Sequence, residues 1–408
     1  MKEKTSAFGI GRNIALLRTR LGMTQSDLAG KLYVSNKTVS KWECGIGYPE
    51  ITQLPRLARV LGTTVDNLLM GERYGIAIVG NILIDAVKHI DAYPQKGMLS
   101  NITALSRAVG GCIPNTGIDL AVIDPSLSIC GIGCVGNDEA GRFLIGELQK
   151  YGIDVSGIVR SETTPTGFSD VMTLAGTGER TFFHHRGANA EFSPADISME
   201  ALHCRMLHVG YVFLLDRFDE ADEAYGTVMA RFLAEAQRLG IRTSFDVVSD
   251  SNGCFCEKVV PALRYADNAF MNEIEAGAVS GLPARDEKGE LNLQNIRRTM
   301  EIILAHGVRE RVILHCPEAG FCLNANGEFT VVPSLKIDKR DIKGTVGAGD
   351  AFCAGCLWAI YRDLTDREML EFASATAACS LFSEDAVSGM RHKDEIYKLM
   401  QARERIAL

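Results

Sequence analysis

Apolar side chains in the first 70 residues recur at the three- and four-residue spacing of amphipathic helices. Five such stretches lie between residues 10 and 69. Glycines and capping hydroxyl residues separate them, namely Gly22, Thr24, Ser35, Gly45 and Gly47. The pattern predicts about five short helices in a compact bundle, with Thr24 and Ser35 capping the second and third.

Beyond residue 73, short apolar runs typical of strands alternate with helical stretches. We expect strands at 74–79, 128–135, 206–213, 242–248, 268–271 and 311–315, and helices at 139–151 and 220–239. This alternation predicts a parallel sheet with helices on both faces. One stretch differs, because extended runs at 167–175 and 180–184 are joined by Gly176-Thr177-Gly178, a hairpin signal where a crossover helix is expected.

Charge divides at the same point along the chain. Residues 1–73 carry eleven Lys/Arg and six Asp/Glu, net +5, which leaves 32 against 45, net −13, for the remainder and gives the overall −8. A basic segment on an acidic body predicts nucleic acid as the partner of the first part and a small molecule as the partner of the second. The connector at Glu72-Arg73 is very short, so we expect no flexible linker.

Composition bounds the class of protein. With 408 residues and 46% hydrophobic content, the chain can form one large domain and a small one. No apolar run approaches the ~18–20 residues of a membrane span and no signal-peptide core is present, so we expect a cytoplasmic protein without a membrane partner. The twelve cysteines are scattered, and the CxxC at Cys353 and Cys356 has no second pair at zinc-site spacing. We therefore expect reduced, buried thiols.

A glycine cluster near the C-terminal end carries the strongest chemical signal. Residues 344–352 read GTVGAGDAF, so glycines lead into an apolar helix whose first turn holds Asp350. Glycines let backbone N–H groups converge, and a helix N-terminus adds about half a positive charge, so this turn can hold an anion that develops during a reaction. Asp350 would then be a general base for a substrate hydroxyl. The segment alone equally fits an ordinary N-cap aspartate after a glycine turn.

The same segment resembles the second signature, DTxGAGD, of the PfkB family of carbohydrate and nucleoside kinases, which have the ribokinase-like fold. The resemblance implies that the backbone of Gly347, Ala348 and Gly349 forms an anion hole for the transferred phosphate. It also makes Asp350 the catalytic base and places Thr345 at the cofactor site. ATP and Mg²⁺ are the cofactors that it implies.

Substrate-binding positions follow from the same resemblance. Asp85 comes after the first strand, and Gly110-Gly111 precedes Asn115, the pattern with which these kinases bind a polyhydroxylated substrate. Asp85 would accept hydroxyl hydrogens, and the glycines would let the ring approach the backbone. Without the other motifs, Asp85 also fits a turn at a strand end and the glycines fit a plain loop.

Asn272 and Glu275 fit the family's NxxE element, which orders magnesium and its waters near the nucleotide phosphates. Magnesium prefers oxygen ligands and water, so the pair is chemically suitable. The two residues alone also fit a helix start with an acidic first turn.

Three positions depart from the family pattern. Gly344 replaces the aspartate that helps to bind a monovalent cation in relatives, which puts cation activation in question. Leu83 stands where ribokinases usually carry Asn, so another sugar or a nucleoside is expected rather than ribose. Pro317, in His315-Cys316-Pro317, stands where relatives have a glycine near nucleotide phosphate, and proline has no N–H to donate. These departures motivate the alternative of a degenerate kinase.

Residues 22–45, GMTQSDLAGKLYVSNKTVSKWECG, resemble the helix-turn-helix of the phage-repressor (Xre/Cro-type) family. The resemblance covers nearly all of residues 8–70 and implies an operator DNA and a homodimer. Gln25 would face a phosphate. The other residues expected at the DNA lie on or beside the recognition helix, namely Ser35, Asn36, Lys37, Thr38 and Lys41. An ordinary helical packing unit with a solvated polar face is the alternative.

One glycine motif is a decoy. Gly131, Gly133 and Gly136 match the dinucleotide-binding GxGxxG after a strand, but the expected helix start at Asn137-Asp138 follows the third glycine. In a dinucleotide-binding turn the third glycine belongs inside the helix. We therefore expect no NAD site, and the stretch instead resembles the first PfkB signature.

These patterns together predict an α/β protein, a ribokinase-like three-layer α/β/α sandwich with a small β lid, preceded by an all-α helix-turn-helix domain. We place the domains at 1–73 and 74–408, with the lid in parts of 86–109 and 165–188. The expected function is ATP-dependent phosphorylation of a sugar, sugar acid or nucleoside hydroxyl by a kinase fused to a DNA-binding transcriptional regulator. The alternative is a ligand-sensing regulator whose kinase fold is catalytically degenerate.

Overall fold

The computed structural model describes residues 9–70, 74–174, 179–199, 202–249 and 254–408. The chain divides into two compact units, Met1–Tyr74 and Gly75–Leu408. The connector at Glu72-Arg73 and the turn at Gly176-Thr177-Gly178 lie outside the described residues. No helix in the described part of the chain has the length and hydropathy needed to span a membrane.

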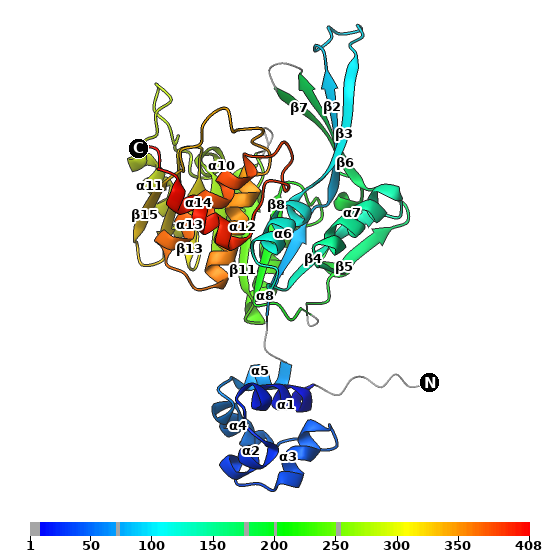
Figure 1. The fold of residues 1–408 in the computed structure, drawn as a ribbon, viewed down its shortest axis with the longest axis vertical. Coiled ribbons are helices and arrows are strands. Elements are labelled where there is room, and N and C mark those ends of the chain that lie inside the picture. Colours follow the sequence, from blue (N-terminus) through cyan, green and yellow to red (C-terminus); the bar gives the residue numbers. More distant parts are fainter. Residues whose placement is uncertain (1–8, 71–73, 175–178, 200–201, 250–253) are drawn as a thin grey trace. The chain divides into compact units, whose positions relative to one another are not determined.

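The N-terminal unit is helical, which confirms the five predicted helices (Figure 1). They are α1 (Ile10–Arg20), α2 (Gln25–Leu32), α3 (Asn36–Glu43), α4 (Leu54–Val60) and α5 (Val65–Met70), with a 3₁₀ turn at Ile51–Gln53 before α4. The Thr24 side chain caps α2 in a reciprocal box with Asp27, and the Ser35 side chain accepts from the Thr38 amide to cap α3. A closed core of apolar side chains, including Ile14, Leu28 and Leu57, holds the bundle together.

The second unit is built on a nine-stranded sheet of order β15-β14-β13-β12-β11-β8-β1-β4-β5. The strands are β1 (Ile76–Gly80), β4 (Ile129–Gly136), β5 (Asp154–Ser161), β8 (Met206–Val212), β11 (Arg242–Val247), β12 (Asn268–Asn272), β13 (Arg311–His315), β14 (Ala319–Asn324) and β15 (Phe329–Pro333). Pairing is parallel from β5 to β13, whereas β14 and β15 are antiparallel. The predicted parallel sheet is confirmed, and the antiparallel edge was not predicted.

Helices cover both faces of this sheet (Figure 1). One core holds side chains of α6 (Cys112–Ile123), α7 (Glu139–Lys150), α12 (Ala348–Tyr361), α13 (Asp366–Ser380) and α14 (Lys393–Ala402). The other core holds those of α8 (Val228–Arg238), α9 (Phe255–Leu263), α10 (Glu273–Ser280) and α11 (Leu293–Ala305). Strand β1 shows the reason, because Ile76 and Ile78 enter the first core while Ala77 and Val79 enter the second.

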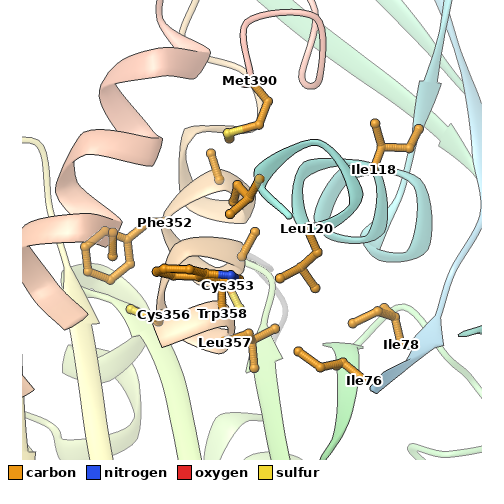
Figure 2. Close-up of a cluster of buried hydrophobic side chains, with 14 of the residues drawn as sticks. Ile76, Ile78, Ile118, Leu120, Phe352, Cys353, Cys356, Leu357, Trp358 and Met390 are labelled. Atoms are coloured by element: carbon orange, nitrogen blue, oxygen red, sulfur yellow. The ribbon is translucent and has the colours of Figure 1, made fainter. Parts of the chain in front are cut away.

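Helix α12 is buried over most of its length in the first core. Every residue from Ala351 to Ile360 is buried, and the Trp358 ring stacks on Phe372 of α13 with centroids 4.3 Å apart. Figure 2 shows Leu357 and Trp358 facing Leu120 of α6 and Ile76 of β1. The helix that carries the glycine cluster is therefore held on all sides.

One predicted helix begins later than expected. The sequence predicted a helix at 220–239, but α8 begins at Val228, and a small hairpin of β9 (Ala221–Asp222) and β10 (Gly226–Thr227) precedes it. The Asp222 carboxylate accepts from the Ala224 and Tyr225 amides, which closes the hairpin turn. Thr227 then caps α8 by accepting from the Ala230 amide at 3.1 Å.

The three glycines of the decoy motif lie in strand β4, and α7 begins at Glu139, after the N-cap Asp138. A Cβ on Gly133 would lie 2.7 Å from the Gly80 carbonyl oxygen, so this glycine permits close strand packing. The Asp138 carboxylate also accepts from the Thr166 amide at 2.8 Å. The motif thus serves the sheet and the base of the lid.

Four further strands form a separate sheet that projects beyond the main one (Figure 1). Its order is β3-β2-β6-β7, with β2 (Leu83–Ile90), β3 (Ile102–Gly110), β6 (Gly167–Leu174) and β7 (Arg180–His185). The Asn189 side chain fixes its base, because it accepts from the Ile82 amide and donates to the Ile82 carbonyl, both at 2.9 Å. We call these four strands the lid.

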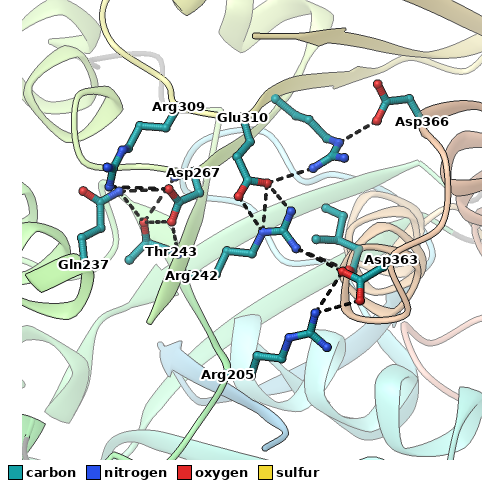
Figure 3. Close-up of polar contacts among 11 residues, drawn as sticks. Arg205, Gln237, Arg242, Thr243, Asp267, Arg309, Glu310, Asp363 and Asp366 are labelled. Carbon is teal, nitrogen blue, oxygen red and sulfur yellow. Dashed lines mark hydrogen bonds and ion pairs between the residues drawn. The ribbon is translucent and has the colours of Figure 1, made fainter. Parts of the chain in front are cut away.

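The amino ends of the central strands carry a network of ion pairs (Figure 3). Arg242 opens β11 and donates to Glu310 at 2.9 Å, and Arg311 opens β13 and donates to Asp366 at 2.6 Å. Arg205 pairs with Asp363 at 2.8 Å. We call this group the amino-end network. It lies at the end of the sheet opposite the residues described next.

Candidate active site

Asp350 is the third residue of α12 and is half-buried beside two hydrogen-bond donors. The Asn115 amide of α6 donates to its Oδ2 at 3.0 Å, and the Tyr211 hydroxyl of β8 donates to its Oδ1. Burial, together with repulsion from Asp246, raises the pKa of Asp350 to about 6, although the two hydrogen bonds oppose the shift. The carboxylate is thus oriented, and it is ionised at neutral pH as a base must be.

The glycine turn in front of Asp350 is sterically required. Gly347 has φ of 78°, and a Cβ there would lie 2.6 Å from the Cβ of Ala386 and 2.7 Å from its Cα. A Cβ on Gly349 would lie 3.2 Å from the His315 ring. The first turn of a helix leaves amides without partners inside the helix, so the amides of 347–349 are suited to an anion.

Asp85, at the start of the lid strand β2, faces the same region. A Cβ on Gly110 would lie 2.6 Å from Asp85 Oδ2. Gly111 has φ of 91°, and a Cβ there would lie 2.6 Å from the Asn81 carbonyl oxygen. The Asn81 Oδ1 accepts from the Cys112 amide at 2.9 Å. Burial, and repulsion from Asp350, raise the pKa of Asp85 to about 7, while Arg180 opposes the shift. The structure therefore brings Asp85, Gly110, Gly111 and Asn115 around one approach to Asp350.

Asn272 and Glu275 form a reciprocal capping box at the start of α10. The Asn272 Oδ1 accepts from the Glu275 amide at 2.9 Å, and the Glu275 carboxylate accepts from the Asn272 amide and from the Ser249 hydroxyl at 2.8 Å. Burial raises the pKa of Glu275 to about 7. Both residues line a cavity of about 290 Å³ that also contains Asp350 and Tyr211. The two residues therefore form a helix start with an acidic first turn, as the alternative predicted, and they line the same cavity as Asp350.

A larger, mainly apolar cavity of about 600 Å³ adjoins the glycine turn. Thr345, Gly349 and Phe352 line one part of it, and His315 and Pro317 line another. Burial lowers the pKa of His315 to about 4, so its imidazole is neutral. The size and the apolar wall of this cavity suit a planar heterocycle.

The structure gives a steric context for the departure at Gly344. A Cβ at that position would lie 2.8 Å from the Ser383 carbonyl oxygen and 3.2 Å from the Glu384 Cα. Backbone, rather than a flexible side chain, occupies the space into which an aspartate would extend.

In the N-terminal unit, the residues expected at DNA divide into two groups. Ser35, Asn36, Lys37 and Lys41 are exposed and Thr38 is half-buried, all on or beside α3. Gln25 differs, because its amide donates to Glu43 at 2.7 Å, and Glu43 also pairs with Arg18 at 2.6 Å. Gln25 thus already has an acceptor within the unit.

Two residues at the site were missed by the sequence reasoning, Tyr211 and Asp246. The Tyr211 hydroxyl donates directly to Asp350, and Asp246 lines the cavity that contains Asp350. Each lies near the carboxyl end of a parallel strand, the edge at which α/β proteins place their ligands. A polar residue near the carboxyl end of a predicted strand was the signal that could have found them.

Comparison with known proteins places these features. The family model of pfkB family carbohydrate kinase matches residues 75–393, and a helix-turn-helix model matches residues 14–68. Fructokinase-1 of Oryza sativa subsp. japonica is 26% identical over 338 residues, covering 79% of this chain and 96% of the relative. Aminoimidazole riboside kinase of Salmonella typhimurium is 28% identical over 317 residues, covering 75% and 91%.

Solved structures agree in fold. The ribokinase of Thermotoga maritima superposes with a TM-score of 0.66 at 24% identity, over 80% of this chain and 99% of that one. The Arabidopsis thaliana ribokinase complexed with ribose and ATP gives 0.67 at 18% identity, over 81% and 99%. The predicted ribokinase-like fold is confirmed, and the chain belongs to the pfkB family of carbohydrate kinases, with a helix-turn-helix segment at its N-terminal end.

Proposed function

We propose that this protein transfers the γ-phosphoryl group of ATP to a hydroxyl of a sugar, sugar acid or nucleoside, with Asp350 as the base. The observation that carries the proposal is the convergence on Asp350 of an anion-binding turn on one side and Asp85 on the other. Fructokinase-1 and aminoimidazole riboside kinase among the relatives support a furanose or a riboside as the substrate class.

The chemistry proceeds from the geometry of these side chains. Asp85 accepts hydrogen bonds from substrate hydroxyls and turns the reacting hydroxyl toward Asp350. Asp350 takes the proton as the oxygen attacks phosphorus, and the amides of 347–349 stabilise the charge on the phosphoryl oxygens. The lid covers the substrate and excludes water that would otherwise accept the phosphoryl group.

The residues present fit magnesium and ATP. Glu275 and Asn272 hold oxygen atoms at the cavity that contains Asp350, and the apolar cavity beside Gly349 accommodates the base of a nucleotide. Mg²⁺ bound there would neutralise phosphate charge, and Glu275 would hold the ion through a water molecule. The Pro317 position contributes no amide to this phosphate site.

The test is ADP release by the purified full chain against a panel of ketoses, aldoses, sugar acids and nucleosides. We expect turnover with one substrate class and its loss in Asp350→Ala. A matched control is Asp338→Ala, because Asp338 is an exposed aspartate whose carboxylate pairs locally with Arg340. Equal turnover by wild type and Asp350→Ala would refute the proposed base.

Gly344 and Pro317 support a second candidate, a sensor that keeps the fold without the chemistry. It predicts that one compound of the panel raises the thermal unfolding midpoint while no ADP is released. It also predicts that Asp350→Asn leaves ligand-dependent DNA binding unchanged.

We further propose that the N-terminal unit binds an operator as a dimer, with Lys37 and Lys41 at phosphates or base edges. Their exposure on α3 supports this placement. We expect Lys37→Ala and Lys41→Ala to weaken binding of a selected duplex and to lower its salt slope by about one for each phosphate that is no longer neutralised. Lys150→Ala, an exposed lysine of the kinase unit, is the control and should bind as wild type does. A monomer by light scattering with and without DNA would contradict the dimer.

A further inference from the structure

A cluster of metal-ligand side chains adjoins the active site through Asp246, and none of the three binds the substrate, ATP or Mg²⁺ in the chemistry above. Within the described part of the chain, ligand atoms of Cys112, His208 and Asp246 all lie within 4.8 Å of one another. The first two side chains have no exposed surface, and Asp246 is 8% exposed. They come from three elements, α6, β8 and β11, so the fold and not a local turn brings them together.

The imidazole is oriented for coordination. The Nδ1 of His208 lies 3.0 Å from the Ser244 hydroxyl, which leaves Nε2 facing the cluster. From Nε2, the Asp246 Oδ1 lies at 3.7 Å and the Sγ of Cys353, on α12, lies at 3.6 Å. A second hydrogen bond that fixes the far nitrogen of a ligating histidine is a regular property of metal sites.

These separations fit a tetrahedral ion. Zinc bonds of 2.0–2.3 Å place neighbouring ligand atoms about 3.3–3.6 Å apart, close to the 3.7 Å between His208 Nε2 and Asp246 Oδ1. By contrast, 3.7 Å is too long for a hydrogen bond between the imidazole and the carboxylate. The imidazole and the carboxylate are therefore spaced as two ligands of one ion.

The carboxylate is the second, independent observation. Asp246 Oδ1 is buried and has no hydrogen-bond partner among the described residues, which is unfavourable for a carboxylate unless a cation meets it. A Cβ on Gly210 would lie 2.5 Å from both Asp246 Oδ1 and Cys112 Sγ. The two ligand atoms thus converge at a position that only a glycine leaves open.

We propose that Cys112, His208 and Asp246 bind a transition-metal ion of the zinc class, with a water molecule as the fourth ligand. Thiolate and imidazole ligands select zinc, copper or iron, and not magnesium, whose preferred ligands are oxygens. The ion is thus distinct from the magnesium that accompanies ATP. Asp246 and Cys353 also line the 290 Å³ cavity, which gives the ion a route in. Once bound, it joins β8 and β11 to helix α6, which carries Asn115.

The test uses the full chain under reducing conditions, in a background where the exposed cysteines Cys44, Cys254 and Cys256 are serine. The protein is stripped with a chelator and titrated with Co²⁺, and then with Zn²⁺ as competitor. We expect one cobalt per chain, a thiolate-to-cobalt charge-transfer absorption, its displacement by Zn²⁺ and its persistence in excess Mg²⁺. Cys112→Ser and His208→Gln should weaken binding by about 100-fold or more.

Cys356→Ser is the matched control, because Cys356 is a fully buried cysteine of α12 that lies outside the cluster (Figure 2). It should keep wild-type affinity and the rise in thermal unfolding midpoint on adding Zn²⁺, a rise that Cys112→Ser should lack even where it folds. Absence of stoichiometric binding by the natively folded background protein would overturn the proposal. Equal binding by Cys112→Ser and Cys356→Ser would overturn it as well.

Discussion

The two ends of the parallel sheet treat their carboxylates in opposite ways. In the amino-end network, Glu310 and Asp366 each accept from an arginine that opens a strand (Figure 3). At the carboxyl end, Asp85 and Asp350 are half-buried and Glu275 is buried, and none of them accepts a hydrogen bond from an arginine of the described residues. Loss of solvent raises the pKa of each. The amino end therefore stabilises the fold. The carboxyl end keeps carboxylates where solvation of their charge is poor, a cost in stability that is typical of catalytic sites.

The largest effect expected from breaking this contrast is on turnover. Asp350→Asn should lower kcat by about 10²- to 10⁴-fold, because the amide cannot take the hydroxyl proton. ADP release at saturating substrate measures this. A decrease below tenfold would mean that proton removal is not a demanding step.

The same substitution should raise stability at neutral pH. The folded pKa of Asp350, about 6, lies above the unfolded value, so its ionised form is penalised in the folded state as pH rises through that range. We expect Asp350→Asn to raise the free energy of unfolding by about 2 kcal/mol above pH 6, and by nothing below pH 4. Urea unfolding at the two pH values measures the difference, and a gain of equal size at both would contradict this origin.

The amino end should respond in the reverse sense. Arg311→Met leaves Asp366, whose side chain is 13% exposed, without its cation, and should lower the free energy of unfolding by about 2–3 kcal/mol. Turnover should stay within twofold of wild type. Arg205→Ala is the control, because its pair with Asp363 is solvent-exposed and should contribute less than about 1 kcal/mol. Similar losses from both substitutions would show that burial does not set the difference.

A smaller effect concerns pH dependence at the carboxyl end. Turnover should rise with pH through about 6 as Asp350 loses its proton. The Tyr211 hydroxyl stabilises that carboxylate, so Tyr211→Phe should move the rise to higher pH and lower kcat by about tenfold at pH 6. A pH profile of kcat tests both expectations. An unchanged profile would remove Tyr211 from control of the base.

The sequence predicted these two ends unequally. Apolar periodicity found the helices of the first unit and most central strands, because burial on one or both faces leaves a regular pattern. Glycine motifs found Asp350 and its turn, since only glycine fits at Gly347. Tyr211 and Asp246 gave no such pattern, being single polar residues in apolar strands whose partners are far along the chain. Their roles depend on strand order, which spacing does not encode.

The close contact at Gly344 has an evolutionary consequence. Because the backbone of Ser383 and Glu384 occupies the space of a side chain, an aspartate cannot return by one substitution without displacing that loop. The loop 383–386 also packs against Gly347 through Ala386, so displacing it would disturb the turn in front of the base. An exchange of glycine for aspartate at residue 344 is therefore coupled in evolution to the conformation of this loop, because the two have to change together.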